Sequence, residues 1–217
     1  MTRHAGDRAR TGRLPRTARR AQLLGPALDV FVAQGYHAAA MDDIAEAAGV
    51  SKPVLYQHFP GKLELYLALL DSACDQVVAE VRDALASTKD NKERVAATTQ
   101  AFYSYVANPT GAFRLVFESD LTSEPAVRER VDRVTLQCAD ACAEVIADDT
   151  GFPPEVSRLL AVALVGMSQV SARFWLSMPD TTLPQEQATA LIASLAWRGI
   201  RGFPRHEQAT ATLATSD

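Results

Sequence analysis

The apolar positions of this 217-residue chain recur at three- and four-residue intervals almost throughout, and no segment alternates in the way typical of a strand. The pattern predicts a first helix that ends before Gly35, two short helices on either side of Gly49, and a long helix from Lys62 to about Ala86. Turn and capping residues place further helices at about 90–107, 111–121, 124–147, 155–177 and 185–202. We therefore predict an all-α chain with nine helices.

The two short helices have the spacing of a DNA-reading helix-turn-helix. Ala45 falls where the two helices approach most closely, and Gly49 falls where the chain must leave the first helix with a positive φ. Ser51 is expected to cap the second helix. Pro53 fits the first turn of that helix, because a missing N–H costs no hydrogen bond there.

The outward side of the second helix suits DNA better than it suits water. Leu55 and Phe59 are four residues apart, so one apolar edge packs inward and the other residues face out. Lysine and glutamine can hydrogen-bond base edges, proline and valine can contact a thymine methyl, and tyrosine, histidine and a following lysine can reach phosphates. The predicted DNA-binding residues are Lys52, Pro53, Val54, Tyr56, Gln57, His58 and Lys62. An ordinary helical hairpin with exposed polar residues is the alternative.

The segment from Arg20 to Leu70 resembles the amino-terminal DNA-binding domain of the TetR family of bacterial transcriptional regulators. The shared features are a Gly-Tyr turn, D-I-A, G-V-S-K, L-Y-x-H-F and a lysine, which stand here at Gly35–Tyr36, Asp43–Ala45, Gly49–Lys52, Leu55–Phe59 and Lys62. Ala40 departs from the family's usual Thr or Ser cap, and Leu63 stands where an acid is usual. The lost cap should cost about 1 kcal/mol, partly offset by acids in the first helical turn.

The basic charge gathers at the amino-terminal end, although the chain as a whole has a net charge of −4. Residues 1–62 carry nine Lys and Arg against five Asp and Glu, a balance of +4, whereas the remaining 155 residues carry thirteen against twenty-one, a balance of −8. We expect a basic, disordered arm that could follow phosphates or enter a minor groove. A solvated tail without DNA contacts is the alternative. The expected divisions are the arm at 1–16, the helix-turn-helix domain at 17–70, a ligand-binding and dimerisation domain at 71–205, and a disordered tail at 206–217.

The last two long helices carry apolar side chains around most of their circumference, among them Leu159, Phe174, Leu195 and Trp197. Because one buried face cannot use them all, a second surface should cover the outer side, most simply a copy of the same chain. The resemblance implies the same, since TetR regulators dimerise through a four-helix bundle made by their last two long helices. Packing wholly within one chain is the alternative.

A narrower resemblance covers most of the chain, through residues 35–71, 113–131 and 164–176. These strings are similar to actinobacterial TetR regulators that control fatty-acid synthase operons and sense long-chain acyl-CoA. The resemblance implies transcriptional activation of lipid synthesis, with acyl-CoA releasing the regulator from DNA. Residues that could line a long apolar cavity for this effector are Phe102, Tyr105, Phe113, Val116, Phe117, Leu164, Met167, Phe174 and Trp175. The alternative for each is an ordinary place in the core.

The sequence favours neither catalysis nor a metal site. A Gly-rich phosphate loop, an H-E-x-x-H motif and a nucleophile elbow are absent, and the four histidines are scattered. We therefore expect no enzyme and no cofactor other than the effector. Cys74, Cys138 and Cys142 fit buried apolar positions better than a metal site or a redox pair. Without a signal segment or a run of eighteen apolar residues, we expect a cytoplasmic protein with no membrane partner.

Three functions fit these observations. The first is an acyl-CoA-sensing activator of fatty-acid synthesis genes that binds a double-stranded operator as a homodimer. The second is a TetR repressor of an efflux or catabolic operon that senses a drug or metabolite. The third, from a different class, is a helical acyl-carrier protein whose helix-turn-helix is vestigial. Sequence-selective DNA binding would separate the third function from the other two.

Overall fold

A computed structural model describes residues 15–117, 121, 123–179 and 183–201 of the chain. Over these residues it contains nine α-helices and no strand, which confirms the predicted all-α architecture. Most of the expected arm and the expected tail at 206–217 lie outside the described residues. The first helix, α1, begins at Arg16.

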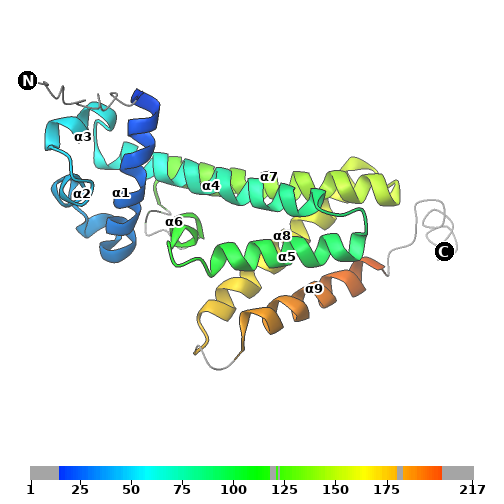
Figure 1. The fold of residues 1–217 in the computed structure, drawn as a ribbon. Helices are drawn as coiled ribbons and strands as arrows, with labels where there is room; N and C mark the ends of the chain where they lie inside the picture. Colours follow the sequence, from blue (N-terminus) through cyan, green and yellow to red (C-terminus); the bar gives the residue numbers. More distant parts are fainter. Residues whose placement is uncertain (1–14, 118–120, 122, 180–182, 202–217) are drawn as a thin grey trace, which may run out of the picture.

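Three helices form a small head at one end of the molecule (Figure 1): α1 (Arg16–Ala38), α2 (Met41–Ala47) and α3 (Lys52–His58). Gly35 breaks the regular part of α1, because its φ of 76° lies in the region that glycine adopts without a Cβ clash. Apolar side chains of all three helices, including Phe31, Ile44 and Leu55, are buried in one core. As expected, Ala40 makes no side-chain cap at the start of α2, whose first turn holds two aspartates.

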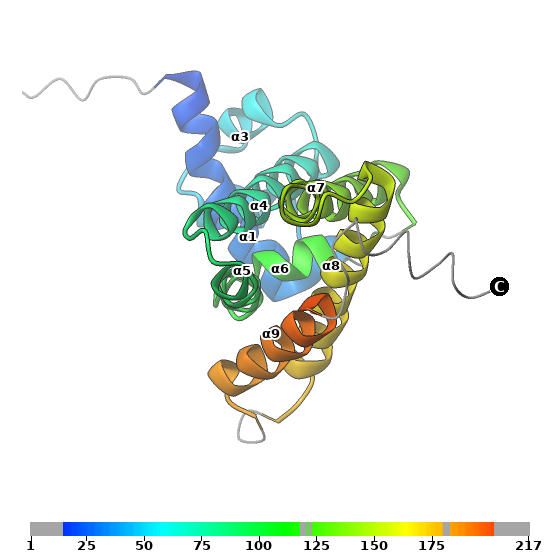
Figure 2. The same cartoon turned by 90° about the vertical axis from the view of Figure 1, so that its right-hand side faces the viewer.

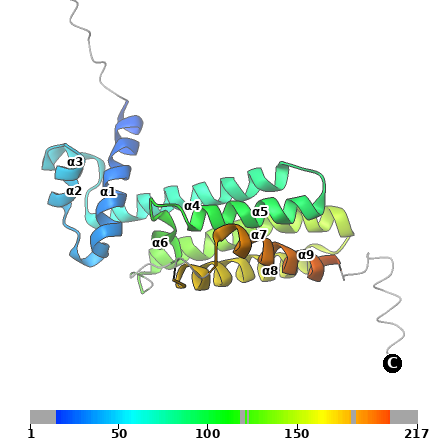
Figure 3. The same ribbon diagram turned by 60° about the horizontal axis from the view of Figure 1, so that its bottom comes forward.

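The other six helices form an elongated body: α4 (Lys62–Ala86), α5 (Asn91–Val106), α6 (Ala112–Phe117), α7 (Pro125–Thr150), α8 (Pro154–Leu176) and α9 (Gln185–Arg201). The helix α4 leaves the head and packs against α5 and α7, while α8 packs on α7 and α9 packs on α5 (Figures 2 and 3). The expected division between residues 70 and 71 falls inside α4. A continuous helix therefore joins the head to the body.

Helix ends in the body follow their capping residues. The Oδ1 atom of Asp90 accepts a hydrogen bond of 2.9 Å from the backbone N–H of Glu93, so Asp90 caps α5 as expected. The helix α7 runs to Thr150, three residues beyond the predicted end, because Gly151, with φ of 72°, is the first residue that can close it in the left-handed conformation. The predicted extension of α6 to residue 121 includes positions outside the described residues.

The outer face of α8 is exposed and apolar. Leu159, Val170 and Phe174 lie on one side of the helix and are 70%, 61% and 64% exposed. An 18-residue window of α8 has a mean hydropathy of 1.5, so by length and composition alone this helix could cross a membrane. The sequence-based expectation was that no unbroken run of eighteen apolar residues exists, and α8 contains none, because Arg158 and Gln169 interrupt its apolar residues. Its inner side packs against α7, which leaves the outer face to be covered by something else.

Candidate functional site

The helix α3 has one buried apolar edge and one polar face that is exposed to solvent. Leu55 and Phe59 are fully buried, as the four-residue spacing predicts. Among the residues predicted to bind DNA, Lys52, Pro53, Tyr56 and Gln57 are exposed, whereas Val54 and His58 are partly buried. The structure therefore gathers six of the seven residues on one short helix, with the side chains of four of them accessible to a large partner.

The turn before α3 has the geometry of a helix-turn-helix. Gly49 has φ of 63°, which confirms the predicted positive angle, and the N–H of Val50 donates to the carbonyl of Ala45. Ser51 occupies the N-cap position, but its hydroxyl makes no capping bond, so the prediction of a side-chain cap is wrong. Pro53 lies in the first turn of α3 as expected. The proline and the backbone turn, rather than the serine hydroxyl, fix the start of this helix.

The ammonium of Lys52 is paired with a carboxylate of α2. Its Nζ atom lies 2.6 Å from Oδ2 of Asp42, and both side chains are more than half exposed. The hydrogen bond to Asp42, with the attraction of the same carboxylate, raises the pKa of Lys52. Because both groups are exposed, salt screens the pair strongly and a phosphate or base edge can replace the carboxylate.

Lys62, predicted to contact a phosphate, makes hydrogen bonds within the protein that the sequence did not indicate. Its Nζ atom donates to the carbonyl oxygens of Tyr36 at 2.8 Å, His37 at 3.2 Å and Ala39 at 2.9 Å. These three bonds use the three N–H donors of the ammonium, which also lies 4.5 Å from the centroid of the Tyr36 ring. Lys62 therefore joins the start of α4 to the chain that leaves α1.

Two arginines that the sequence analysis did not single out hold the end of α3. Arg20 donates to the carbonyl of His58 and lies 4.0 Å above the Phe59 ring, and Arg16 donates to the carbonyl of Gln57. These bonds use carbonyls that the helix end leaves without helical partners. The arginine-rich start of the chain was the available signal, but it indicated only a basic arm.

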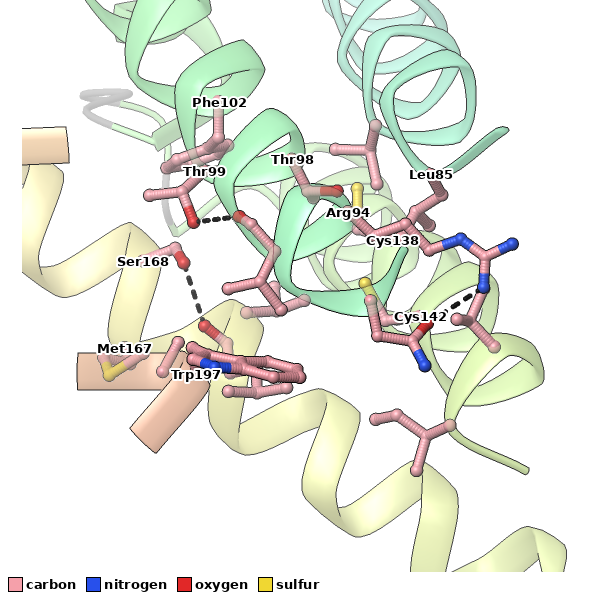
Figure 4. Close-up of a pocket in the computed structure, with 18 of the residues that line it drawn as sticks. Leu85, Arg94, Thr98, Thr99, Phe102, Cys138, Cys142, Met167, Ser168 and Trp197 are labelled. Carbon is pink, nitrogen blue, oxygen red and sulfur yellow. Dashed lines mark hydrogen bonds between the residues drawn. The ribbon is translucent and has the colours of Figure 1, made fainter. Parts of the chain in front are cut away.

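A second candidate site is an apolar cavity of about 130 Å³ inside the body. Its walls come from α4, α5, α7 and α8 and from Phe117 of α6, with Trp197 of α9 at one side (Figure 4). Polar and charged residues, including Asn91, Arg94 and Asp149, lie along the part of the wall formed by the start of α5 and the end of α7. The rest of the wall is mainly apolar and includes Phe102 and Phe117, with a few hydroxyl, amide and thiol groups among the apolar side chains. The cavity can therefore take a molecule with a polar end and an apolar end.

Four of the residues predicted to contact the ligand line this cavity: Phe102, Phe117, Leu164 and Met167. The other five do not. Phe113 and Val116 are buried in the core, and Tyr105 is buried with its hydroxyl donating to the carbonyl of Ala73 at 3.2 Å. Trp175 packs against Tyr103 and donates to the carbonyl of Leu183, while Phe174 is exposed. These five residues are therefore not part of the wall of this cavity, and their contact with a ligand stays a prediction.

Several lining residues were missed or assigned elsewhere. Trp197, which was expected at a dimer interface, is among the residues that line the cavity. Cys138 and Cys142 also line it, and burial raises the pKa of both thiols, to about 12 and about 11. The wall also includes Thr98, which the sequence analysis did not consider. The four-residue spacing of Cys138 and Cys142 was the available signal, since it places both on one face of α7. Among the described residues no cluster of metal-binding side chains is found.

Residues 23–69 match the sequence profile of bacterial regulatory proteins of the tetR family. The chain is 46% identical, over 93% of its own length and 92% of the relative's, to the HTH-type transcriptional activator FasR of Mycolicibacterium smegmatis. Among solved structures, a TetR-like transcriptional regulator from Rhodococcus sp. RHA1 is 28% identical with a TM-score of 0.64, covering 88% of this chain and 100% of that one. The transcriptional regulator FadR from Bacillus subtilis, in complex with stearoyl-CoA, is 17% identical with a TM-score of 0.66, covering 81% and 96%. From its amino-terminal profile and its similarity to FasR over most of the chain, the protein belongs to the tetR family of bacterial regulatory proteins.

Proposed function

We propose that this transcriptional regulator binds its operator as a homodimer and is released from it by a long-chain acyl-CoA, with fatty-acid synthesis genes as its targets. The observation that carries the proposal is the apolar cavity with one polar end, in a chain 46% identical to the activator FasR. The solved complex of FadR with stearoyl-CoA supports the idea that this fold accommodates such a ligand.

DNA recognition is assigned to the exposed face of α3. Gln57 and Lys52 are suited to base edges, Pro53 and Val54 to a thymine methyl, and Tyr56 and His58 to phosphates. Lys52 would exchange Asp42 for the DNA. Lys62 is left out of this set because its ammonium already bonds three carbonyls. A protein that acts on an operator works where the chromosome is, which places it in the cytoplasm.

The dimer is assigned to the outer faces of α8 and α9. Leu159, Val162 and Phe174 on α8, and Leu191 and Leu195 on α9, are exposed apolar residues that a second copy would cover. Gly166 lies within the α8 stripe, and a Cβ atom at this position would meet nothing within 4 Å among the described residues, which leaves room for a partner helix. A dimer would hold two reading helices about 34 Å apart, one turn of DNA.

Release from DNA requires that the effector bind more tightly to the arrangement that cannot hold DNA. The helix α4 contributes Val81 and Leu85 to the cavity wall and begins at Lys62 in the head. A shift of α4 on ligand binding would therefore change the distance between the two heads of a dimer. By reciprocity, operator DNA should lower the affinity for acyl-CoA by the same factor.

The experiment has two stages. DNA fragments of the source genome are first selected by the purified protein and sequenced, with enrichment of a fatty-acid synthase promoter as the expected result. Release of the selected fragment is then titrated with palmitoyl-CoA and, separately, with a cationic drug. Leu164→Phe, which fills the cavity, should bind DNA normally and resist palmitoyl-CoA, whereas Leu136→Phe on the exposed side of α7 should respond like the wild type. Enrichment of a transporter promoter with release by the drug would contradict the proposal.

A further inference from the structure

The hydroxyl of Thr98 is a buried hydrogen-bonding group in the cavity wall that has no hydrogen-bond partner among the residues that the structure describes. The neighbouring polar groups of the wall are satisfied differently. The hydroxyl of Thr99 donates to the carbonyl of Val95 at 2.7 Å, and that of Ser168 donates to the carbonyl of Leu164 at 3.0 Å. The amide of Gln169 donates to the hydroxyl of Thr135 at 3.2 Å. Thr98 therefore differs from its neighbours, and a buried hydroxyl without a partner destabilises the protein.

The position of Thr98 divides the cavity into a polar and an apolar part along α5. Arg94 lies about one helical turn before it and Asn91 about two turns before it, whereas Phe102 lies about one turn after it. Phe102 contacts Phe117 of α6, with 6.0 Å between the ring centroids. In Figure 4 the hydroxyl points toward the side of the cavity where Cys138 lies. A ligand along α5 would thus pass from charged side chains, past one unpaired hydroxyl, to two aromatic rings.

The charges near the start of α5 decide which kind of group this hydroxyl suits. The guanidinium of Arg94 is held by the carbonyl of Thr88 and the Oδ1 atom of Asn91. Asp149, an exposed acid, lines the same end of the cavity, so that end carries both signs. Deeper in, where Thr98 lies among apolar groups and thiols, a charged ligand group would lose its hydration without a counter-ion. A neutral acceptor such as a carbonyl oxygen has no such cost.

We propose that Thr98 donates a hydrogen bond to the thioester carbonyl of the effector, with the hydrocarbon directed toward Phe102 and Phe117 and the CoA part toward Arg94. This inference rests on the proposed function and adds the direction of insertion and the residue that distinguishes a thioester from other long-chain molecules. In the unliganded protein the unpaired hydroxyl lowers stability, and the hydrogen bond to the ligand removes this destabilisation on binding.

The test compares two ligands that differ in one group. Palmitoyl-CoA carries the thioester carbonyl, and S-hexadecyl-CoA replaces the carbonyl with a methylene at the same chain length. Their affinities are measured by calorimetry on the wild type, on Thr98→Val, which replaces the hydroxyl with a methyl group of similar size, and on Thr99→Val. The adjacent Thr99 is the matched control, because it also lines the cavity but uses its hydroxyl within its own helix.

The wild type should prefer palmitoyl-CoA, and Thr98→Val should weaken palmitoyl-CoA binding about fivefold to tenfold while leaving S-hexadecyl-CoA unchanged. Thr99→Val should keep the wild-type preference. Thr98→Val should also unfold at a higher temperature without ligand, because it removes a buried unpaired group, whereas a merely structural threonine would give the opposite shift. Equal losses for both ligands, or no loss for either, would overturn the assignment.

Two further outcomes keep the inference distinct from the proposed function. If the wild type binds both CoA compounds and neither releases DNA, the proposed function fails while the affinity comparison still decides the role of Thr98. If the wild type binds neither compound, both proposals are overturned. Should Thr98→Val fail to fold, Thr98→Ser keeps the hydroxyl and should keep the preference, and equal affinities of the wild type and Thr98→Ser for the two ligands would overturn the inference.

Discussion

The ammonium of Lys62 lies 2.8 Å from the carbonyl oxygen of Tyr36 and 4.5 Å from the centroid of the Tyr36 ring. Tyr36 follows Gly35, where the regular part of α1 is broken, so its carbonyl is not used by a continuing helix. Lys62 is the first residue of α4, the helix that joins the head to the body. This contact therefore fixes the position of the head at the point where α4 enters it.

The first prediction is that Lys62→Met destabilises the head rather than weakening phosphate contacts. Removal of the ammonium leaves three backbone carbonyls without a charged donor, which should lower the free energy of unfolding by about 1.5–3 kcal/mol. Urea unfolding followed by circular dichroism measures this loss. Lys52→Met is the matched control, because the Lys52 ammonium is exposed and pairs only with an exposed carboxylate, so its removal should change stability little.

The outcome for the salt slope separates two roles for Lys62. If Lys62→Met folds as stably as the wild type but reduces the slope of log affinity against log salt by about 1, the ammonium contacts phosphate and the structural role is wrong.

The second prediction separates base contacts from phosphate contacts on α3. Gln57→Ala should relax the sequence preference at one position of each half-site by about 1–3 kcal/mol, because an exposed amide that reads a base edge is lost. Tyr56→Phe should weaken binding to all sequences alike, since it removes a hydroxyl assigned to phosphate. Competition binding against a randomised operator library measures both effects. Uniform weakening by Gln57→Ala would show that this amide reads no base.

The third prediction concerns the apolar face of α8 and α9. Leu195→Glu should convert the dimer to a monomer and abolish binding to a palindromic operator, because a charge would be buried against the partner's apolar face. Leu136→Glu, at an exposed leucine on α7, is the control and should leave the dimer intact. Sedimentation velocity at micromolar concentration gives the assembly state. A wild-type protein that sediments as a monomer would remove the basis of this interpretation.

The fourth prediction is that the cavity thiols are unreactive near neutral pH. Burial raises the pKa of Cys142 from 9.0 to about 11, which lowers the thiolate fraction at pH 8 roughly 100-fold. Iodoacetamide labelling of Cys142, followed by mass spectrometry, should therefore be slow at pH 8 and accelerate about tenfold per pH unit until pH 11. Palmitoyl-CoA should slow it further. Rapid labelling at pH 7 would indicate the redox role that the sequence left open.

The raised pKa values of the cavity thiols also determine how the stability of the protein changes with pH. The folded protein favours the protonated thiols of Cys138 and Cys142 more than the unfolded chain does, so their contribution is fully present below pH 9. It declines as the pH rises from 9 toward 11 and 12. Urea unfolding at pH 8 and pH 10 should show lower stability at the higher pH, with a smaller difference in Cys138→Val.

The head could be predicted from the sequence because local chemistry decides it. Gly49 requires a positive φ, Pro53 fits only a first turn, and Leu55 and Phe59 share one edge of a helix, so spacing alone determined the fold there. The role of Lys62 could not be found in the same way. Its partners are carbonyls 23–26 residues earlier, and only the tertiary arrangement brings them together.

The cavity was harder to predict because an apolar residue looks the same in a core and in a cavity wall. Phe113 and Phe102 belong to one aromatic cluster, with 6.5 Å between their ring centroids, yet only Phe102 lines the cavity. Trp197 and Leu195 are two residues apart on α9 but face different surroundings, one the cavity and the other solvent. Hydrophobicity and periodicity predict that such residues make apolar contacts. The packing of α8 and α9 on the other helices of the body decides which surface each of them contacts.

The last prediction concerns the turn between α5 and α6, which touches the head. Gly111 has φ of 71°, and a Cβ atom at this position would lie 2.8 Å from Cγ1 of Val32 on α1. Gly111→Ala should therefore strain the backbone and push α6 away from α1, at a cost of about 1–3 kcal/mol in unfolding free energy. Because Phe117 of α6 lines the cavity, the variant should also need more palmitoyl-CoA to release DNA.

Gly25→Ala is the matched control, since Gly25 lies within α1 and a Cβ there would meet nothing within 4 Å, so this variant should be slightly more stable and respond normally. Val32→Ala combined with Gly111→Ala removes the close approach but not the strained φ, and should restore the response to palmitoyl-CoA more than it restores stability. Thermal unfolding and the midpoint of DNA release are measured on all four proteins. If Gly111→Ala loses stability and still releases DNA at the wild-type palmitoyl-CoA concentration, the contact between α6 and α1 does not carry the signal, and α4 is left as the route from the cavity to the head.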